Sequence, residues 1–149
     1  MKLVLPFLRA AITVLVIVSL AACSKKDSLP PTMFMTWTVD GTNMKAESHT
    51  AAPIGNVIIG SGTAKETPNG IYLTLPKSVG TYPLTSTSNR DAIYVVGNSN
   101  GTSQDYNGTS GTVVVTSVTD KTITGTFSFT GSDGTTSKTV MNGKFSLNF

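Results

Sequence analysis

The sequence has few of the residues on which catalysis and metal binding usually depend. Its 149 residues include one histidine, one cysteine and one tryptophan, and only 13% of the side chains are charged. A single histidine excludes a metal site built from several histidines, and a single cysteine excludes a disulfide within the chain. His49 lies between Ser48 and Thr50, in a segment that we expect to be a solvated loop. We therefore predict no enzyme activity, no cofactor and no metal site.

The chain also lacks an apolar run of membrane-spanning length. Residues 10–20 are apolar, but only 15 residues lie between Arg9 and Lys25, whereas a spanning helix needs about 20 apolar residues. A positively charged start, a short apolar run and a pair of small residues are the three parts of a secretory signal. We therefore expect residues 1–22 to be a cleaved signal peptide.

The end of this segment, Leu20-Ala21-Ala22-Cys23, resembles the lipobox of bacterial lipoproteins at all four positions. The resemblance implies cleavage between Ala22 and Cys23, attachment of a diacylglycerol to the sulfur of Cys23, and usually an acyl chain on the new amino group. Two or more acyl chains give stable membrane attachment. The expected location is the cell envelope, at the outer membrane. The absence of an acidic run after Cys23 favours the side that faces the periplasm.

Excess charge of one sign is also missing from the rest of the chain. Two of the 11 basic residues, Lys2 and Arg9, lie in the signal, which leaves nine basic against eight acidic side chains. This balance provides no electrostatic footprint for nucleic acid. Residues 23–32 are polar and contain two prolines, so we expect a tether there. Residues 33–149 then form a single β domain.

What the chain does contain is alternation with a period of two residues, bounded by turn residues. In residues 122–130, Ile123, Phe127 and Phe129 alternate with hydroxyl residues, as in a strand with one face in the core. Threonine is abundant, and β-branched side chains favour strands. We predict an all-β fold, either an antiparallel β-sandwich or a small barrel-like meander of about eight or nine strands. The expected strands are 33–39, 42–47, 57–65, 71–75, 91–96, 104–107, 111–118, 122–130 and 144–149, and residues 80–84 are expected to form a short edge strand or a connection.

Several local signals refine this prediction. Asp40-Gly41 is typical of a two-residue hairpin turn. Asn142-Gly143 interrupts the last strand and indicates a β-bulge. Pro83 lacks a backbone donor, which favours an edge strand for its segment.

Three pieces of the chain resemble a group of small, uncharacterised lipoproteins of diderm bacteria. They are FMTWTVDGTNMKA (residues 34–46), GTYPL (80–84) and the C-terminal stretch that contains GTVVVT, ITGTFSFT and NGKFSLNF. These are strand-and-turn patterns. The resemblance implies an envelope lipoprotein and transfers no activity or functional residue.

Aromatic residues are the remaining candidates for a ligand site. Trp37, Tyr72 and Tyr94 lie on predicted strands, where they could form a platform for sugar rings or line an apolar groove, although such residues also pack in cores. The predicted function is a membrane-anchored module that binds an envelope protein or a glycan. One alternative is a lipocalin-like carrier with an apolar cavity. The other is an enzyme that uses His49 or Glu47. The sequence does not define the ligand or the oligomeric state.

Overall fold

The computed structural model describes residues 32–65, 68–87 and 91–149, and these residues form nine β-strands without any helix. In the same part of the chain, no helix has the length and hydropathy needed to cross a membrane. The strands are β1 (Phe34–Val39), β2 (Thr42–Ile54), β3 (Val57–Ala64), β4 (Gly70–Pro76), β5 (Gly80–Thr85), β6 (Ala92–Gly97), β7 (Ser103–Val118), β8 (Thr122–Ser132) and β9 (Ser137–Asn148).

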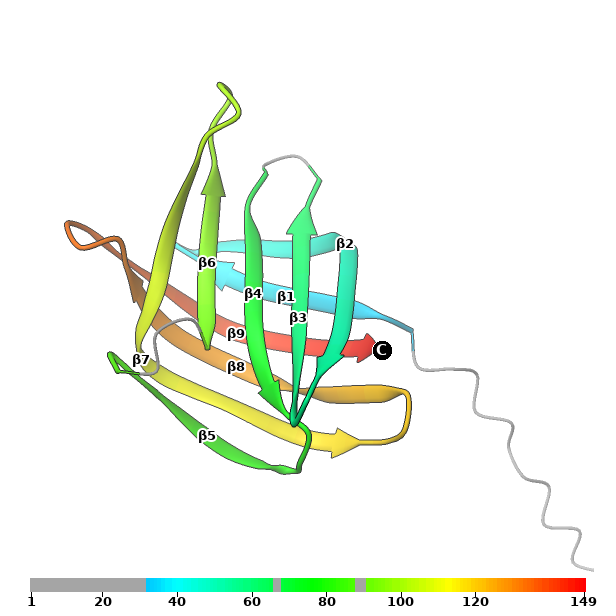
Figure 1. Ribbon diagram of the computed structural model, residues 1–149. Coiled ribbons are helices and arrows are strands. Elements are labelled where there is room, and N and C mark those ends of the chain that lie inside the picture. Colours follow the sequence, from blue (N-terminus) through cyan, green and yellow to red (C-terminus); the bar gives the residue numbers. More distant parts are fainter. Residues whose placement is uncertain (1–31, 66–67, 88–90) are drawn as a thin grey trace, which may run out of the picture.

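The strands form one antiparallel sheet that closes on itself. Its order is β5-β7-β6-β4-β3-β2-β1-β9-β8, and a further pairing joins β7 to β8 (Figure 1). Eight strands therefore make a closed barrel, and β5 is an extra strand outside the ring. The extra strand is possible because β7 is long: along one edge, residues 103–107 pair with β6 and residues 110–115 pair with β5.

The interior of the barrel is filled by side chains, as expected for a ring of eight strands. Large residues lie opposite inward-facing glycines. A methyl group added at Gly60 would lie 2.5 Å from Leu147 Cδ1, and one added at Gly125 would lie 2.6 Å from Phe145 Cζ. The largest fully buried side chains are Trp37, Tyr94, Phe145, Met35, Ile58, Ile71, Leu73, Leu75, Ile123, Leu147, Val113 and Val115.

The structure confirms the predicted fold class, and of the two architectures left open it is the barrel. Asp40 and Gly41 have φ angles of 50° and 78°, and the two-residue turn pairs Val39 with Thr42. The bulge in β9 is also present, since this strand has one extra residue against both β1 and β8, and Asn142 has a φ of 54°. As expected, β5, which contains Pro83, lies at the end of the sheet order.

Three predictions of strand boundaries were wrong. The strand predicted for residues 144–149 begins at Ser137, on the other side of the bulge. The strand predicted for residues 42–47 extends to Ile54, because a bulge near Glu47 shifts the register and hides the period-two pattern. His49 therefore lies in β2 and not in a loop. The strands predicted for residues 104–107 and 111–118 are a single bent strand, β7, with a register shift between Gly108 and Ser110 against β8.

The predicted signal peptide (residues 1–22), the lipid attachment at Cys23 and most of the tether lie outside the described residues.

Candidate functional site

The three aromatic residues singled out in the sequence lie on opposite faces of the wall. Trp37 and Tyr94 point into the barrel and are 1% and 2% exposed, whereas Tyr72 points outward and is 44% exposed. Register explains the difference, because Tyr94 is paired with Ile71, so Tyr72 falls on the other face of β4. The three residues therefore form no common platform.

The two inward-facing residues belong to the core. The Tyr94 ring lies 6.1 Å from that of Tyr106, and burial raises the pKa of the Tyr94 hydroxyl. The indole Nε1 of Trp37 is buried and has no hydrogen-bond partner among the described residues.

His49 has a structural contact at a corner of the barrel. The backbone pairing between β1 and β2 ends at Thr36 and Lys45. The next residue of β1, Met35, has no partner on β2 in this pairing, and its N–H donates to His49 Nε2 at 3.1 Å. An imidazole that accepts this bond is neutral. Partial burial and the nearby charge of Lys45 lower the pKa of His49, which favours the same neutral form.

In the part of the chain that the structure describes, no metal-binding cluster assembles around these residues. Glu47 lies 4.0 Å from Lys65. Among the described residues, no three histidine, cysteine, aspartate or glutamate side chains are placed to hold a metal ion.

One pentapeptide, Gly97-Asn98-Ser99-Asn100-Gly101, has the spacing Gly-x-Ser-x-Gly of a hydrolase nucleophile. That motif works at a sharp turn from a strand into a helix. Here the segment is the turn between β6 and β7, closed by a hydrogen bond from Asn98 N–H to Thr102 O at 2.8 Å. Ser99 therefore does not lie in a nucleophile elbow.

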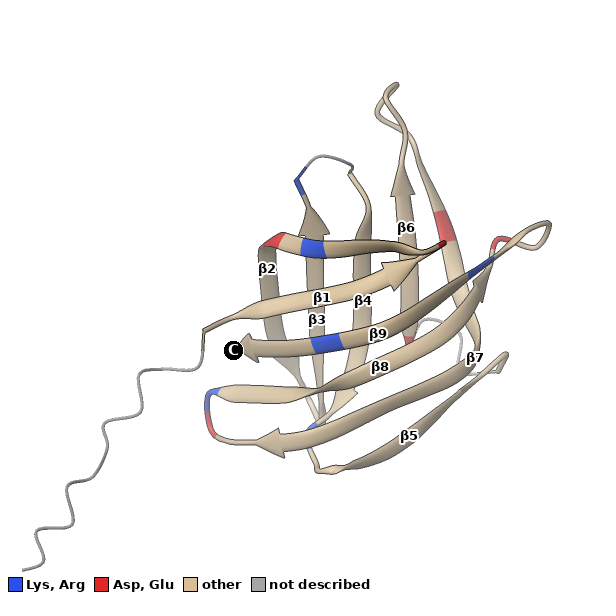
Figure 2. Ribbon diagram, turned by 180° about the vertical axis from the view of Figure 1, so that it is seen from behind, with Lys and Arg blue, Asp and Glu red and all other residues tan. Residues whose placement is uncertain are grey.

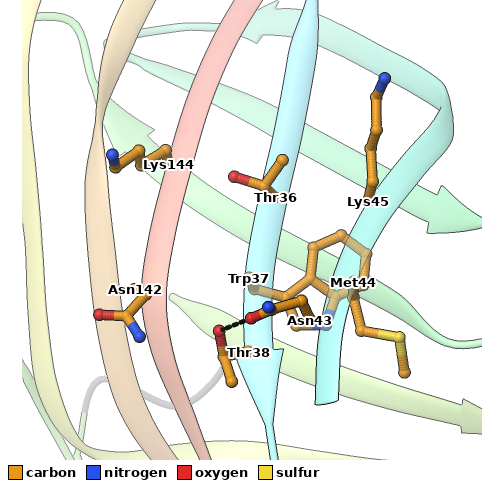
Figure 3. Close-up of a pocket in the computed structure, with 8 residues that line it drawn as sticks. All are labelled: Thr36, Trp37, Thr38, Asn43, Met44, Lys45, Asn142 and Lys144. Carbon is orange, nitrogen blue, oxygen red and sulfur yellow. Dashed lines mark hydrogen bonds between the residues drawn. The ribbon is translucent and has the colours of Figure 1, made fainter. Parts of the chain in front are cut away.

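The outer wall carries a shallow depression over β9, β1 and β2, which we call the outer groove (Figure 3). It has a volume of about 390 Å³. Trp37 and Met44, which are paired with each other and pack on the inner side of the wall, are among its lining residues, and the other lining side chains are polar or charged. The lining residues are Thr36, Trp37, Thr38, Asn43, Met44, Lys45, Asn142 and Lys144.

Two local features shape the outer groove. The Asp40-Gly41 turn sets the register that places Thr38 beside Asn43, and the Thr38 hydroxyl donates to Asn43 Oδ1 at 2.8 Å. On the other side of β1, the bulge in β9 leaves two consecutive residues, Met141 and Asn142, exposed. Figure 3 shows Thr38 turned toward Asn43, and Asn142 on β9 at the other side of β1.

The central row of the groove is Lys45, Thr36 and Lys144. Thr36 is paired with Lys45 of β2 on one edge and with Lys144 of β9 on the other. Since neighbouring strands lie about 4.8 Å apart, the two lysine backbones are about 10 Å apart. In Figure 2, blue segments that mark basic residues lie on β2 and on β9, on either side of β1.

Shallow hollows continue from the outer groove on both sides. One extends over β7 and β8 and shares Asn142 and Lys144 with the groove. The other extends toward β3 and shares Lys45 and its neighbours. The surface is therefore an extended strip, which would suit a long ligand better than a small enclosed one.

The outer groove and the whole barrel fall within a single conserved domain. Residues 33–147 match the family described as "Domain of unknown function (DUF6252)". The chain belongs to this family. Comparisons with curated proteins and with solved structures gave no match.

The DUF6252 domain begins one residue before β1 and ends one residue before the end of β9, so it covers all nine strands apart from Asn148. All eight residues of the outer groove lie within it. Because the family description assigns no activity, the function of this DUF6252 member must be argued from its geometry.

A second depression of this DUF6252 barrel lies where β5 leaves the ring. It is more enclosed and more apolar than the outer groove, with a volume of about 220 Å³. Its lining includes Val57 of β3, Pro76 of β4, and Tyr82 and Leu84 of β5. Leu84 is 5% exposed and belongs to the core cluster, so this crevice reaches the edge of the barrel interior.

Sequence reasoning missed the outer groove, although part of it had a signal. A two-residue hairpin turn at Asp40-Gly41 fixes the pairing of Thr36 with Lys45. The contribution of Lys144 had no local signal, because it depends on the pairing of the first strand with the last.

Proposed function

We propose that this protein is a binding module of the bacterial envelope, anchored by a lipid on Cys23, and that its ligand occupies the outer groove. The observation that carries the proposal is the outer groove itself. It is a strip on the outer wall in which polar and charged side chains from three strands face solvent together. A glycan or an extended segment of an envelope protein fits such a strip, because both present hydrogen-bonding groups at regular intervals.

The packed interior supports the outer wall as the binding surface. At Gly60 and Gly125, large side chains from other strands occupy the space that a ligand inside the barrel would need. Trp37 and Tyr94 help to fill the same interior. Their proposed contribution is to support the wall from inside.

Substitution of Thr36 by tryptophan tests the outer groove. Thr36 faces outward at its centre, so T36W would fill the groove without disturbing the core. The matched control is T135W, at an exposed position in the turn between β8 and β9 that lines neither the groove nor the hollows beside it. We expect T36W to lower affinity for envelope glycan or protein ligands at least tenfold in titration calorimetry, and T135W to leave it unchanged. Equal binding by both variants would exclude the outer groove.

A second candidate function, carriage of a small apolar ligand as in lipocalins, rests on the crevice beside β5. Native mass spectrometry of the purified full chain tests it. A lipid that co-purifies in stoichiometric amount, and is lost in L84W, would favour this function over the first. A measured mass equal to that of the protein without a bound lipid would count against this function.

A further inference from the structure

We infer that the outer groove binds an acidic oligosaccharide, with Lys45 and Lys144 each contacting one negatively charged group. The inference rests on the proposed binding function and names its ligand class. It follows from three properties of the groove: its charge, its unused hydrogen-bond donors and its spacing.

The charge of the groove is positive. Its lining contains two lysines and no acidic residue. The two carboxylates nearest in sequence do not line it: Asp40 forms an ion pair with Lys138, and Glu47, whose carboxylate lies 4.0 Å from the Lys65 ammonium, lines the adjoining hollow toward β3. Among the described residues, neither Lys45 nor Lys144 has a carboxylate within 4.0 Å.

The hydrogen-bonding groups add further donors. Because Asn43 Oδ1 already accepts from the Thr38 hydroxyl, the side-chain amide of Asn43 presents its NH₂ group to the groove. Figure 3 shows Thr36 pointing toward the Lys144 side of β1, between the two ammonium groups. Ammonium and amide donors suit carboxylate or sulfate groups, and hydroxyls suit the uncharged parts of a sugar.

The spacing favours a chain over a single ion. The two lysine backbones stand two strand widths apart, about 10 Å, roughly the length of a disaccharide. Figure 3 shows the ammonium groups of Lys45 and Lys144 pointing away from each other, so one compact anion would not contact both in this arrangement. A sugar chain that lies along the strip can place acidic groups near each lysine and extend into the hollows on both sides.

An anionic membrane is a weaker match for the same surface. Recognition of acidic lipids typically uses clusters of four to eight basic residues, and the outer groove has two. The neighbouring lysines on this side, Lys65 and Lys138, are paired with acids.

The test uses the full chain, purified in an uncharged detergent, with defined probes in titration calorimetry. The acidic probes are a galacturonate hexamer and a sulfated heparin hexasaccharide, and the neutral probe is maltohexaose. Vesicles with acidic phospholipid form a separate arm. We expect at least one acidic oligosaccharide to bind at least tenfold more tightly than maltohexaose, and its affinity to fall as salt rises.

Charge-removing variants locate the interaction. K45Q/K144Q should weaken binding of the acidic oligosaccharide at least tenfold, because two charge-assisted contacts are lost. The control K77Q/K121Q removes the same charge from exposed positions outside the groove and should change affinity less than twofold. Thermal midpoints of both double variants that equal the wild-type midpoint would show that the fold tolerates all four substitutions.

Several outcomes overturn the inference, and they separate it from the proposed function. If a neutral glycan or a protein ligand binds at least as tightly, and T36W abolishes that binding, the proposed function stands and the acidic ligand is wrong. Binding to acidic vesicles without binding to either acidic oligosaccharide also overturns the inference. So does an equal loss of oligosaccharide affinity in K45Q/K144Q and K77Q/K121Q. If no ligand is sensitive to T36W, both proposals fall.

Discussion

At the scale of single residues, His49 shows how a side chain can replace part of a β-ladder. Where β2 turns away from β1, the Met35 N–H loses a backbone partner, and the imidazole Nε2 of His49 takes that place. The contact depends on a neutral ring, since a protonated imidazole has no acceptor. The lone histidine of this chain therefore has a defined structural role at the barrel corner.

This contact predicts a pH dependence of stability. The pKa of His49 in the folded protein lies below its ordinary value of 6.5, so the unfolded chain binds a proton more readily than the folded one. The stabilisation is complete above about pH 6.5 and is lost as the pH falls through the folded pKa. We expect thermal midpoints of the wild type to fall between pH 7.5 and pH 5, by an amount equivalent to about 1 kcal/mol at most.

The variant H49Q provides the comparison, because a glutamine side-chain oxygen can accept the same bond and does not titrate. Its thermal midpoint should vary less over that pH range than the midpoint of the wild type. Parallel profiles for the two proteins would contradict the role assigned to His49.

At the scale of elements, the bend in β7 depends on close backbone contact at Gly111. This glycine has a φ of 143°, and a methyl group there would lie 2.3 Å from the Ser128 carbonyl oxygen of β8. The bend lets β7 pair with β6 along one half of an edge and with β5 along the other. A glycine at this position thus allows one strand to close the ring and to carry the extra strand.

We expect G111A to lower the free energy of unfolding by about 2 kcal/mol or more, because the chain must shift at a site without space. The matched control is G134A, which has a positive φ of 93° but nothing within 4 Å of the added methyl. Chemical denaturation of both variants checks the prediction. A loss in G134A as large as in G111A would show that backbone conformation alone, and not close contact, sets the cost.

The elements that could be predicted from the sequence are those with local signals. The alternation in β8, the Asp40-Gly41 turn and the bulge at Asn142 each depend on neighbouring residues, and each was found. The second half of β2 was missed, because the bulge near Glu47 changes which residues face inward and Pro53 lies within a paired strand. The face of the wall on which Tyr72 lies depended on the register of β4 against β6, which the sequence pattern did not define.

At the scale of the whole molecule, closure of the barrel brings together residues from opposite ends of the chain. β1 pairs with β9, so the outer groove combines Thr36 and Lys45 with Lys144. No local pattern could have identified this set, because its formation requires the ring to close. The packed interior follows from the same closure and explains why two of the three aromatic residues that suggested a ligand site, Trp37 and Tyr94, belong to the core.

The proposed membrane anchor makes a prediction for the entire protein. Wild-type chain expressed in a bacterial host should incorporate radiolabelled palmitate and fractionate with membranes. C23S should lose the label and retain residues 1–22, because processing of lipoproteins acts on the lipid-modified cysteine. A C23S protein that remained labelled, or a wild type that never incorporated palmitate, would refute the anchor.

The position of β1 has a mechanical consequence. This strand follows directly on the N-terminal part of the chain, forms the centre of the outer groove, and is hydrogen-bonded on one edge to β2 and on the other to β9. A pull on the N-terminal segment, resisted by something held at the groove, would act along the length of β1. Both flanking ladders would then carry the load in shear, with their bonds strained together instead of opening one after another.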